Sequence, residues 1–299
     1  MESIIELNNV SKVFKNKKAV DGISFSIDKG EIVAILGPNG AGKTTTMMMM
    51  LGLLDPSEGS IQLFNNKPKE RFVRERIGAM LQEVSVIDAL KVKEVIQLFR
   101  SYYPRTLSFE ELVDITGFTQ DELKRRANKL SGGQKRRLGF ALAMAGDPDV
   151  LFFDEPTVGL DVTSRKLFWN NVEMLKQRGK TIIFTTHYLQ EADDVAERVI
   201  LFHEGKIIGD GTPKDIKNKL TKQTVSFDAT TMIRYEELLK LPCVNNMYEK
   251  DGRMYLVTEQ TDDVLRALIT KNLQVKNIEI DRGRLEDAFE QLMEKREVV

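Results

Sequence analysis

The sequence has little of what would cross-link a chain or hold it in a membrane. Cys243 is the only cysteine in 299 residues, which excludes an internal disulfide and favours a reducing compartment. Because no neighbouring residue marks a catalytic site, we expect a buried structural thiol there. No apolar run approaches the roughly 18 residues of a membrane span, and Glu2 and Glu6 interrupt any signal-peptide pattern. We therefore expect a soluble chain, with any membrane spans supplied by a partner.

An excess of charge of either sign is also missing. The 44 Lys and Arg residues nearly balance the 45 Asp and Glu residues, giving a net charge of -1. Such a balance provides no overall field that would attract nucleic acid. The basic runs 124–126 and 135–137 have no interleaved aromatic residues on which bases could stack. We expect no nucleic-acid partner.

The first two thirds of the chain have an α/β pattern. Short apolar runs at residues 32–36, 150–153 and 181–184 alternate with helical patterns, which indicates buried parallel strands. Residues 5–14, 19–27 and 60–64 alternate instead, which favours an antiparallel sheet. Strand signals vanish between residues 83 and 130, where 92–100 and 109–116 are typical of helices. The sequence thus predicts a P-loop NTPase core over residues 1–220 with an antiparallel β subdomain and an inserted helical subdomain at about 83–146.

The pattern changes after residue 220. Strands are predicted at 224–228, 253–258 and 275–280, and helices at 235–241, 262–270 and 285–295, with a hairpin turn at Lys250-Asp251-Gly252. The order βαββαβ is typical of a ferredoxin-like fold. Residues 221–299 are therefore predicted to form a small α+β accessory domain.

A glycine-rich loop follows the apolar run 32–36 and leads into a helical pattern, as the phosphate-binding P-loop requires. Lys43 can neutralise charge on β- and γ-phosphates, and the Thr44 hydroxyl can bind Mg²⁺. The alternative, a glycine-rich turn with a surface lysine, does not account for the strand before the loop and the helix after it. The predicted nucleotide-binding residues of this loop are Gly37, Pro38, Asn39, Gly40, Ala41, Gly42, Lys43, Thr44 and Thr45.

A second phosphate-binding loop is predicted at residues 130–134. Ser131 can cap a helix that opens at about Gln134, and Gly132 and Gly133 leave backbone N–H groups accessible to an anion. No P-loop lysine accompanies this loop. It therefore resembles half of a nucleotide site, and we expect a second subunit to supply the other half.

Polar residues follow three of the predicted strands. The strand at 150–153 ends in Asp154 and Glu155, which in a P-loop protein places Asp154 beside magnesium and leaves Glu155 free to act as general base on water. His187 follows the strand at 181–186, where open α/β sheets bind ligands, and can contact the γ-phosphate or the attacking water. Gln82 follows the strand at 77–81, and its amide can reach Mg²⁺ or the same water. The catalytic candidates are thus Glu155, His187 and Gln82, and the metal candidates Thr44, Gln82 and Asp154.

Roughly residues 4–218 resemble the ATP-binding cassette (ABC) ATPases. The motifs that carry this resemblance are, in order, the P-loop, Gln82, the loop 130–134, Asp154-Glu155, Gly159-Leu160-Asp161 and His187. The resemblance implies an enzyme that hydrolyses ATP with Mg²⁺, with Phe14 stacked on adenine and Val20 nearby. It also implies that residues 159–161 link the two sites of a dimer, and that residues 131–134 form a signature loop acting in trans.

Gln82-Glu83, the run 134–138 and residues 283–289 resemble ABC exporters whose permease is a separate polypeptide of the ABC-2 type. This resemblance implies a second ATPase subunit, either identical or a paralogue, and a cytoplasmic location at the inner face of the membrane through the permease. Two alternatives stay open. One is an importer ATPase whose C-terminal domain senses a ligand, and the other is a cassette ATPase acting on DNA or ribosomes, for which the expected coiled-coil insertion or second cassette is missing.

Overall fold

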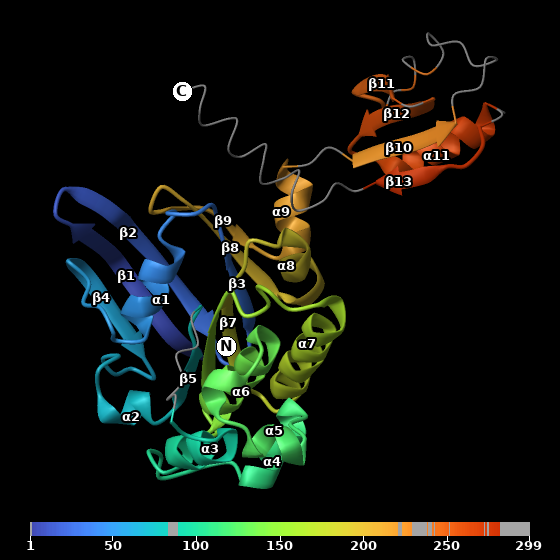
Figure 1. Ribbon diagram of the computed structural model, residues 1–299. Helices are drawn as coiled ribbons and strands as arrows, with labels where there is room; N and C mark the ends of the chain where they lie inside the picture. The colour runs from blue at the N-terminus through green and yellow to red at the C-terminus, as the bar shows by residue number, and fades with distance from the viewer. Residues whose placement is uncertain are drawn as a thin grey trace. The chain divides into compact units, whose positions relative to one another are not determined.

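The computed structural model describes residues 2–82, 89–220, 223–228, 238, 241, 243–250, 252–271, 273 and 275–281. The chain divides into two units, Met1–Asp210 and Gly211–Val299. Each is described by itself below, with the element labels of Figure 1. No helix in the described part of the chain combines the length and the apolar character that a membrane crossing requires.

The centre of the first unit is a six-stranded sheet in the order β5-β6-β7-β3-β8-β9. Its strands are β3 (Ile32–Leu36), β5 (Ile77–Met80), β6 (Val150–Asp154), β7 (Thr181–Thr185), β8 (Arg198–His203) and β9 (Lys206–Gly211). Strands β5, β6, β7, β3 and β8 pair in parallel. Every residue of β3, β6 and β7 is buried, as uninterrupted apolar runs predict. The residues that follow these strands therefore meet at one edge of the sheet.

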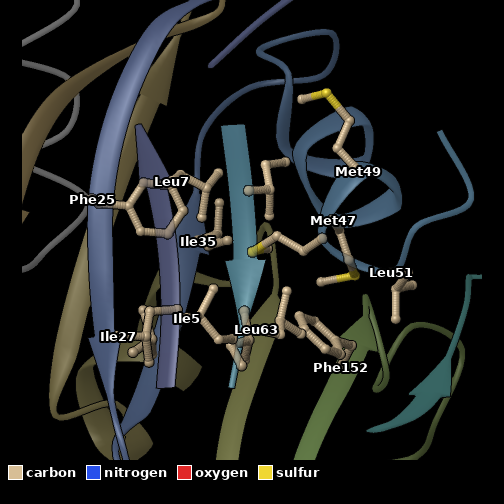
Figure 2. Packing of buried hydrophobic residues seen from close by; sticks show 14 of the residues in the cluster. Ile5, Leu7, Phe25, Ile27, Ile35, Met47, Met49, Leu51, Leu63 and Phe152 are labelled. Carbon is tan, nitrogen blue, oxygen red and sulfur yellow. The ribbon is translucent and has the colours of Figure 1, made fainter. Parts of the chain in front are cut away.

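The alternating segments form a three-stranded antiparallel sheet in the order β2-β1-β4. Its strands are β1 (Ser3–Phe14), β2 (Lys17–Asp28) and β4 (Glu58–Leu63). Helix α1 (Lys43–Met50) packs beside it, and side chains from this sheet, from α1 and from β3 and β6 meet in one core (Figure 2). Met47, Met49 and Met50 of α1 are almost fully buried in that core and fill space between apolar side chains.

Between β5 and β6 the described chain is helical, as predicted. The elements are α3 (Val92–Arg100), α4 (Phe109–Thr116), α5 (Gln120–Lys124), the 3₁₀ turn η1 (Ala127–Lys129) and α6 (Gly132–Met144), and the short α2 (Arg71–Arg74) precedes β5. Helices α3 to α5 gather at the lower end of this unit in Figure 1. The first residues of the helical subdomain predicted at about 83–146, residues 83–88, lie outside the described residues.

Helix α6 approaches strand β5 backbone to backbone. A Cβ atom placed on Gly78 would lie 2.1 Å from the carbonyl oxygen of Ala143, so no larger residue fits at position 78 without separating the two elements. Helix α7 (Val162–Gln177) packs on β7, where the Trp169 ring lies 4.8 Å from that of Phe184. Helix α8 (Leu189–Val195) leads from β7 to β8.

The second unit contains a four-stranded antiparallel sheet in the order β11-β12-β10-β13. Its described elements are α9 (Pro213–Leu220), β10 (Gln223–Asp228), β11 (Asn246–Lys250), β12 (Arg253–Thr258), α11 (Thr261–Thr270) and β13 (Glu279–Asp281). Apolar side chains of α11 and of the sheet form its core, in which Cys243 is buried, as expected for a structural thiol. The predicted helix at 285–295, most of the one at 235–241, and Asp251 lie outside the described residues.

Candidate active site

A cavity of about 650 Å³ opens at the carboxyl edge of the parallel sheet. Five parts of the chain that the sequence prediction singled out meet in its wall, although they lie far apart along the chain. They are the end of β1, the P-loop, and the residues that follow β5, β6 and β7. The lining residues are Phe14, Lys17, Ala19, residues 37–45, Gln82, Glu155 and His187. The sequence prediction therefore identified most of this wall.

The P-loop connects β3 to α1 and holds its own lysine. The Lys43 Nζ atom donates hydrogen bonds to the carbonyl oxygens of Gly37, at 2.7 Å, and Pro38, at 3.0 Å. Burial lowers the pKa of Lys43, while the nearby charges of Glu155 and Asp154 oppose that effect. The loop thus keeps a cation in the cavity wall whose charge is only partly compensated, a setting that favours binding of an anion.

Asp154 ends β6 and is buried. Its Oδ2 atom accepts a hydrogen bond of 3.3 Å from the Thr44 hydroxyl, and its Oδ1 atom accepts one of 2.5 Å from the Thr185 hydroxyl. No cluster of three or more His, Cys, Asp or Glu side chains that could hold a metal is found among the described residues. Mg²⁺ in phosphate sites needs fewer, since it is held by one or two protein oxygens together with phosphates and water. The hydroxyl and carboxylate oxygens of Thr44 and Asp154 fit that requirement.

Glu155 lies where three neighbouring strands end. Gln82 follows β5, Glu155 follows β6 and His187 follows β7. The Gln82 Nε2 atom donates to Glu155 Oε2 at 3.3 Å, and the Nδ1 atom of His187 lies 3.5 Å from Glu155 Oε1. The structure therefore brings together the three side chains that the sequence singled out as catalytic candidates.

The backbone of Glu155 is held in an unusual conformation. Its φ angle is 48°, in the left-handed region that non-glycine residues rarely occupy. The amide of Glu155 donates to both the carbonyl oxygen and the hydroxyl of Thr185, at 3.1 and 3.0 Å, which compensates part of the strain. Strained positions of this kind concentrate at functional sites.

Phe14 and Val20 occupy different environments. Phe14 is 46% exposed at the end of β1 and lines the cavity, whereas Val20 is fully buried in the core. Because side chains alternate along a strand, the β2 residues in the cavity wall are Lys17 and Ala19, which the sequence prediction missed. If Val20 is assigned to the buried face of β2, the two-residue period of a strand places Ala19 and Lys17 on the opposite face, so the sequence contained the signal that would have identified them.

The loop 130–134 does not contribute to the cavity of its own chain, since none of its residues lines it. Ser131 caps α6, which begins at Gly132, two residues before the predicted start. The Ser131 hydroxyl accepts from the Gln134 amide and Gln134 Oε1 accepts from the Ser131 amide, so the two form a capping box. A Cβ atom on Gly132 would meet nothing within 4 Å. The loop is thus a capped helix terminus at which Ser131 and Gly132 are exposed.

The turn 159–161 leads into α7. The Asp161 carboxylate accepts hydrogen bonds from the amide and hydroxyl of Ser164, which hold its pKa below the ordinary range and cap the helix. The next residue, Val162, is 81% exposed.

Comparisons with known proteins agree with this geometry. A model of the family described as ABC transporter matches residues 20–158. The Nod factor export ATP-binding protein I of Paraburkholderia xenovorans is 39% identical over 225 residues, which is 71% of this chain and 72% of that protein. Its counterpart in Burkholderia orbicola is 40% identical over 215 residues, covering 70% and 71%.

Two solved structures are similar as well. A dimeric ATP-binding cassette in a post-hydrolysis state, bound to ADP and Pi, has a TM-score of 0.65 and 27% identity, over 70% of this chain and 98% of that one. The cbiO1 protein of Clostridium perfringens, part of an ABC transporter complex, has a TM-score of 0.63 and 28% identity, over 72% and 91%.

Proposed function

The chain belongs to the ABC transporter family as an ATP-binding subunit that hydrolyses ATP, and we propose that it powers an exporter whose permease is a separate polypeptide of the ABC-2 type. Relatives that are 39% and 40% identical to it over the aligned 225 and 215 residues are named as export ATP-binding proteins. The permease would hold this chain at the cytoplasmic face of the membrane, next to the segment that follows Gln82.

Within one chain, the side chains around the cavity divide the reaction among them. Lys43 and the P-loop amides bind the β- and γ-phosphates, and Phe14 stacks on the adenine. Thr44 and Asp154, together with the amide of Gln82, would hold Mg²⁺, which would neutralise charge on the phosphates. Glu155 takes a proton from the attacking water as general base. Gln82 and His187, both within 3.5 Å of the Glu155 carboxylate, orient the base and the water.

The observation that carries this proposal is the meeting of Gln82, Glu155 and His187 beside Lys43 in one cavity. A triad of amide, carboxylate and imidazole at the ends of three adjacent strands has no role in packing the sheet. It does provide what γ-phosphate hydrolysis requires, namely a base, a group that orients the water and a hydrogen-bond donor for the phosphate.

Two copies pair head to tail in the active state. Each ATP would then lie between Lys43 of one copy and Ser131 and Gly133 of the other, or of a paralogue in its place. Two features support this arrangement: the loop 130–134 lies outside the cavity of its own chain, and a similar cassette was solved as a dimer with ADP and Pi. Closure of the dimer on ATP and its opening after hydrolysis would drive the permease through Gln82.

For the second unit we propose a ferredoxin-like accessory domain. Numbered along the chain, its strands β10, β11, β12 and β13 lie in the sheet order 2-3-1-4, all antiparallel, with α11 between the third and fourth. That order belongs to the βαββαβ arrangement. The helix expected between β10 and β11 falls largely outside the described residues.

Substitution of Glu155 by glutamine tests the assignment of the general base. The amide keeps the size and the contact with Gln82 but cannot accept the proton of water, so we expect turnover to fall by roughly 10²–10⁴-fold while ATP still binds. Dimers should accumulate because ATP stays intact between the two copies. ATPase rate, equilibrium ATP binding and size-exclusion chromatography measure the three effects.

The matched control is Glu173→Gln on the exposed side of α7, which should leave all three unchanged. Hydrolysis at the wild-type rate by the Glu155→Gln variant would show that another group is the base.

A further inference from the structure

We propose that Glu191, on α8, is a positioning residue that joins the segment carrying Glu155 to the segment carrying His187. The inference rests on the proposed roles of those two residues. Glu191 itself does not line the cavity, so it acts on the reaction only through the two segments that it connects.

The two oxygen atoms of the Glu191 carboxylate bind two different segments. The Thr157 hydroxyl donates to Oε1 at 2.7 Å, and the Thr186 hydroxyl donates to Oε2 at 2.8 Å. Thr157 lies two residues after Glu155, and Thr186 directly precedes His187. One carboxylate therefore forms a bridge between the segment of the base and the segment of the histidine. This bridge is additional to the direct contact between Glu155 and His187 at 3.5 Å.

Burial makes this bridge stiff. Glu191 is 6% exposed, and both threonines are 1% exposed. Water cannot replace either hydroxyl at such positions, and a buried carboxylate that loses a donor pays a large desolvation cost. Hydrogen bonds to an ionised acceptor are also shorter and stronger than neutral ones. The carboxylate consequently fixes the spacing of the two segments far better than an exposed glutamate would.

A third group connects the bridge to the turn 159–161. Arg165, in the second turn of α7, has its Nε atom 3.4 Å from Glu191 Oε1, yet that buried atom makes no hydrogen bond. The Arg165 guanidinium also lies 4.7 Å from the centre of the Tyr188 ring, which in turn lies 4.2 Å from the His187 ring. The Arg165 side chain on α7 thus places its charge against the same carboxylate that binds both threonines.

A simpler role for Glu191 would be to anchor the start of α8. Thr186 accepts a hydrogen bond from the Tyr188 amide at 3.0 Å, so Glu191 and Thr186 help to fix the entry to this helix. An anchor of that kind affects stability and needs only Thr186. The bridge, by contrast, needs Thr157 and Thr186 together and affects catalysis, and this difference can be measured.

Paired substitutions separate the two roles. Thr157→Val and Thr186→Val keep the shape but remove a hydroxyl, whereas Thr157→Ser and Thr186→Ser keep the hydroxyl and remove a methyl group. We expect each valine variant to lower kcat by roughly 10–100-fold, because small misplacements of catalytic groups have effects of that size. The KM for ATP should stay unchanged, since no contact of Glu191 reaches the P-loop. Both serine variants should keep kcat near the wild-type value.

The double variant Thr157→Val/Thr186→Val provides the decisive comparison. Loss of either threonine hydroxyl already disconnects the two segments, so the double variant should lose no more activity than either single variant. Independent packing roles would instead multiply the two losses. Thr116→Val, which removes an equally buried hydroxyl from α4, is the control and should keep full activity.

Three results would overturn the inference: valine variants with wild-type kcat, losses that multiply in the double variant, or serine variants impaired as strongly as valine variants. Thermal unfolding of each variant shows whether the chain is folded, and Glu191→Gln, which keeps volume and removes the charge, repeats the test if a valine variant does not fold. Failure of the base assignment is distinguishable, because it is read from Glu155→Gln alone and leaves the comparison of single and double variants intact.

Discussion

The turn between β8 and β9 supports the P-loop from outside the cavity, and Gly205 is its point of contact. The Gly205 amide donates to the Ala41 carbonyl at 3.0 Å, and the Gly205 carbonyl accepts from the Asp21 amide at 2.9 Å. Gly205 has a φ angle of +77°, and a Cβ atom there would lie 2.9 Å from the Ala19 carbonyl oxygen. Gly205→Ala should therefore push the turn away from Ala19 and from the P-loop.

Gly179 provides a control with nearly the same backbone strain. Its φ angle is +76°, but a Cβ atom there would meet nothing within 4 Å. Both alanine variants bear the strain of a left-handed L-residue, roughly 1–2 kcal/mol. Only Gly205→Ala adds an overlap with packed atoms, which costs roughly 1–3 kcal/mol more. If the turn relieves about 1.4 kcal/mol of the overlap energy by displacing the P-loop, and ATP binding has to restore the original P-loop position, the ATP affinity falls about tenfold.

The assay measures the KM for ATP and the unfolding midpoint of both variants beside the wild type. We expect both variants to lose stability, Gly205→Ala more than Gly179→Ala, and only Gly205→Ala to raise the KM. Equal KM values for the two variants would refute the reasoning, because they would show that the turn does not control the shape of the P-loop.

Two further predictions follow from the site. Because burial lowers the pKa of Lys43 and bound phosphate would raise it again, ATP binding should take up a proton and weaken as the pH rises through the range just below the ordinary lysine value of 10.5. In the same pH range the ATP-free chain should gain stability as the pH rises, since the unfolded chain binds more protons there than the folded chain. Titration calorimetry in buffers of different ionisation enthalpy measures the proton uptake, and thermal unfolding measures the stability. An ATP affinity independent of pH would contradict the predicted proton uptake. Gly132→Leu should keep ATP binding but abolish hydrolysis, because its side chain extends into open space where the partner's ATP would lie. An equimolar mixture of Gly132→Leu with the likewise inactive Lys43→Ala should regain activity through mixed dimers, and a mixture as inactive as its components would exclude head-to-tail sharing.

Local sequence patterns were sufficient to predict the elements that carry the site. Strands β3 and β6 are buried on both faces, and a strand of this kind has an unbroken apolar run in its sequence. The helices predicted at 92–100 and 109–116 coincide with α3 and α4, the second of which begins with a capping box at Ser108. Because parallel strands end at one edge, residues after three of them could be expected to meet, and Gln82, Glu155 and His187 do.

Contacts between distant segments could not be read in the same way. Glu191 stands in the acidic stretch 191–194, which by itself is typical of a solvated helix face. Its burial depends on Thr157, which lies 34 residues away and is brought close only when β6 and β7 pair. Val20 illustrates a different limit: the resemblance placed it near the adenine, while the alternation of β2 directs Ala19 to the cavity and Val20 to the core.

The absence of a side chain at Gly78 has a mechanical consequence. Strand β5 leads to Gln82, through which the permease would be driven, and α6 starts at the loop 131–134, which would contact a second ATPase subunit. The contact of Gly78 with the Ala143 carbonyl therefore joins these two segments. Two backbones in direct contact have no flexible side chains between them to absorb a displacement. We therefore expect helix α6 and strand β5 to move together as one body, joined at a residue that does not line the nucleotide cavity.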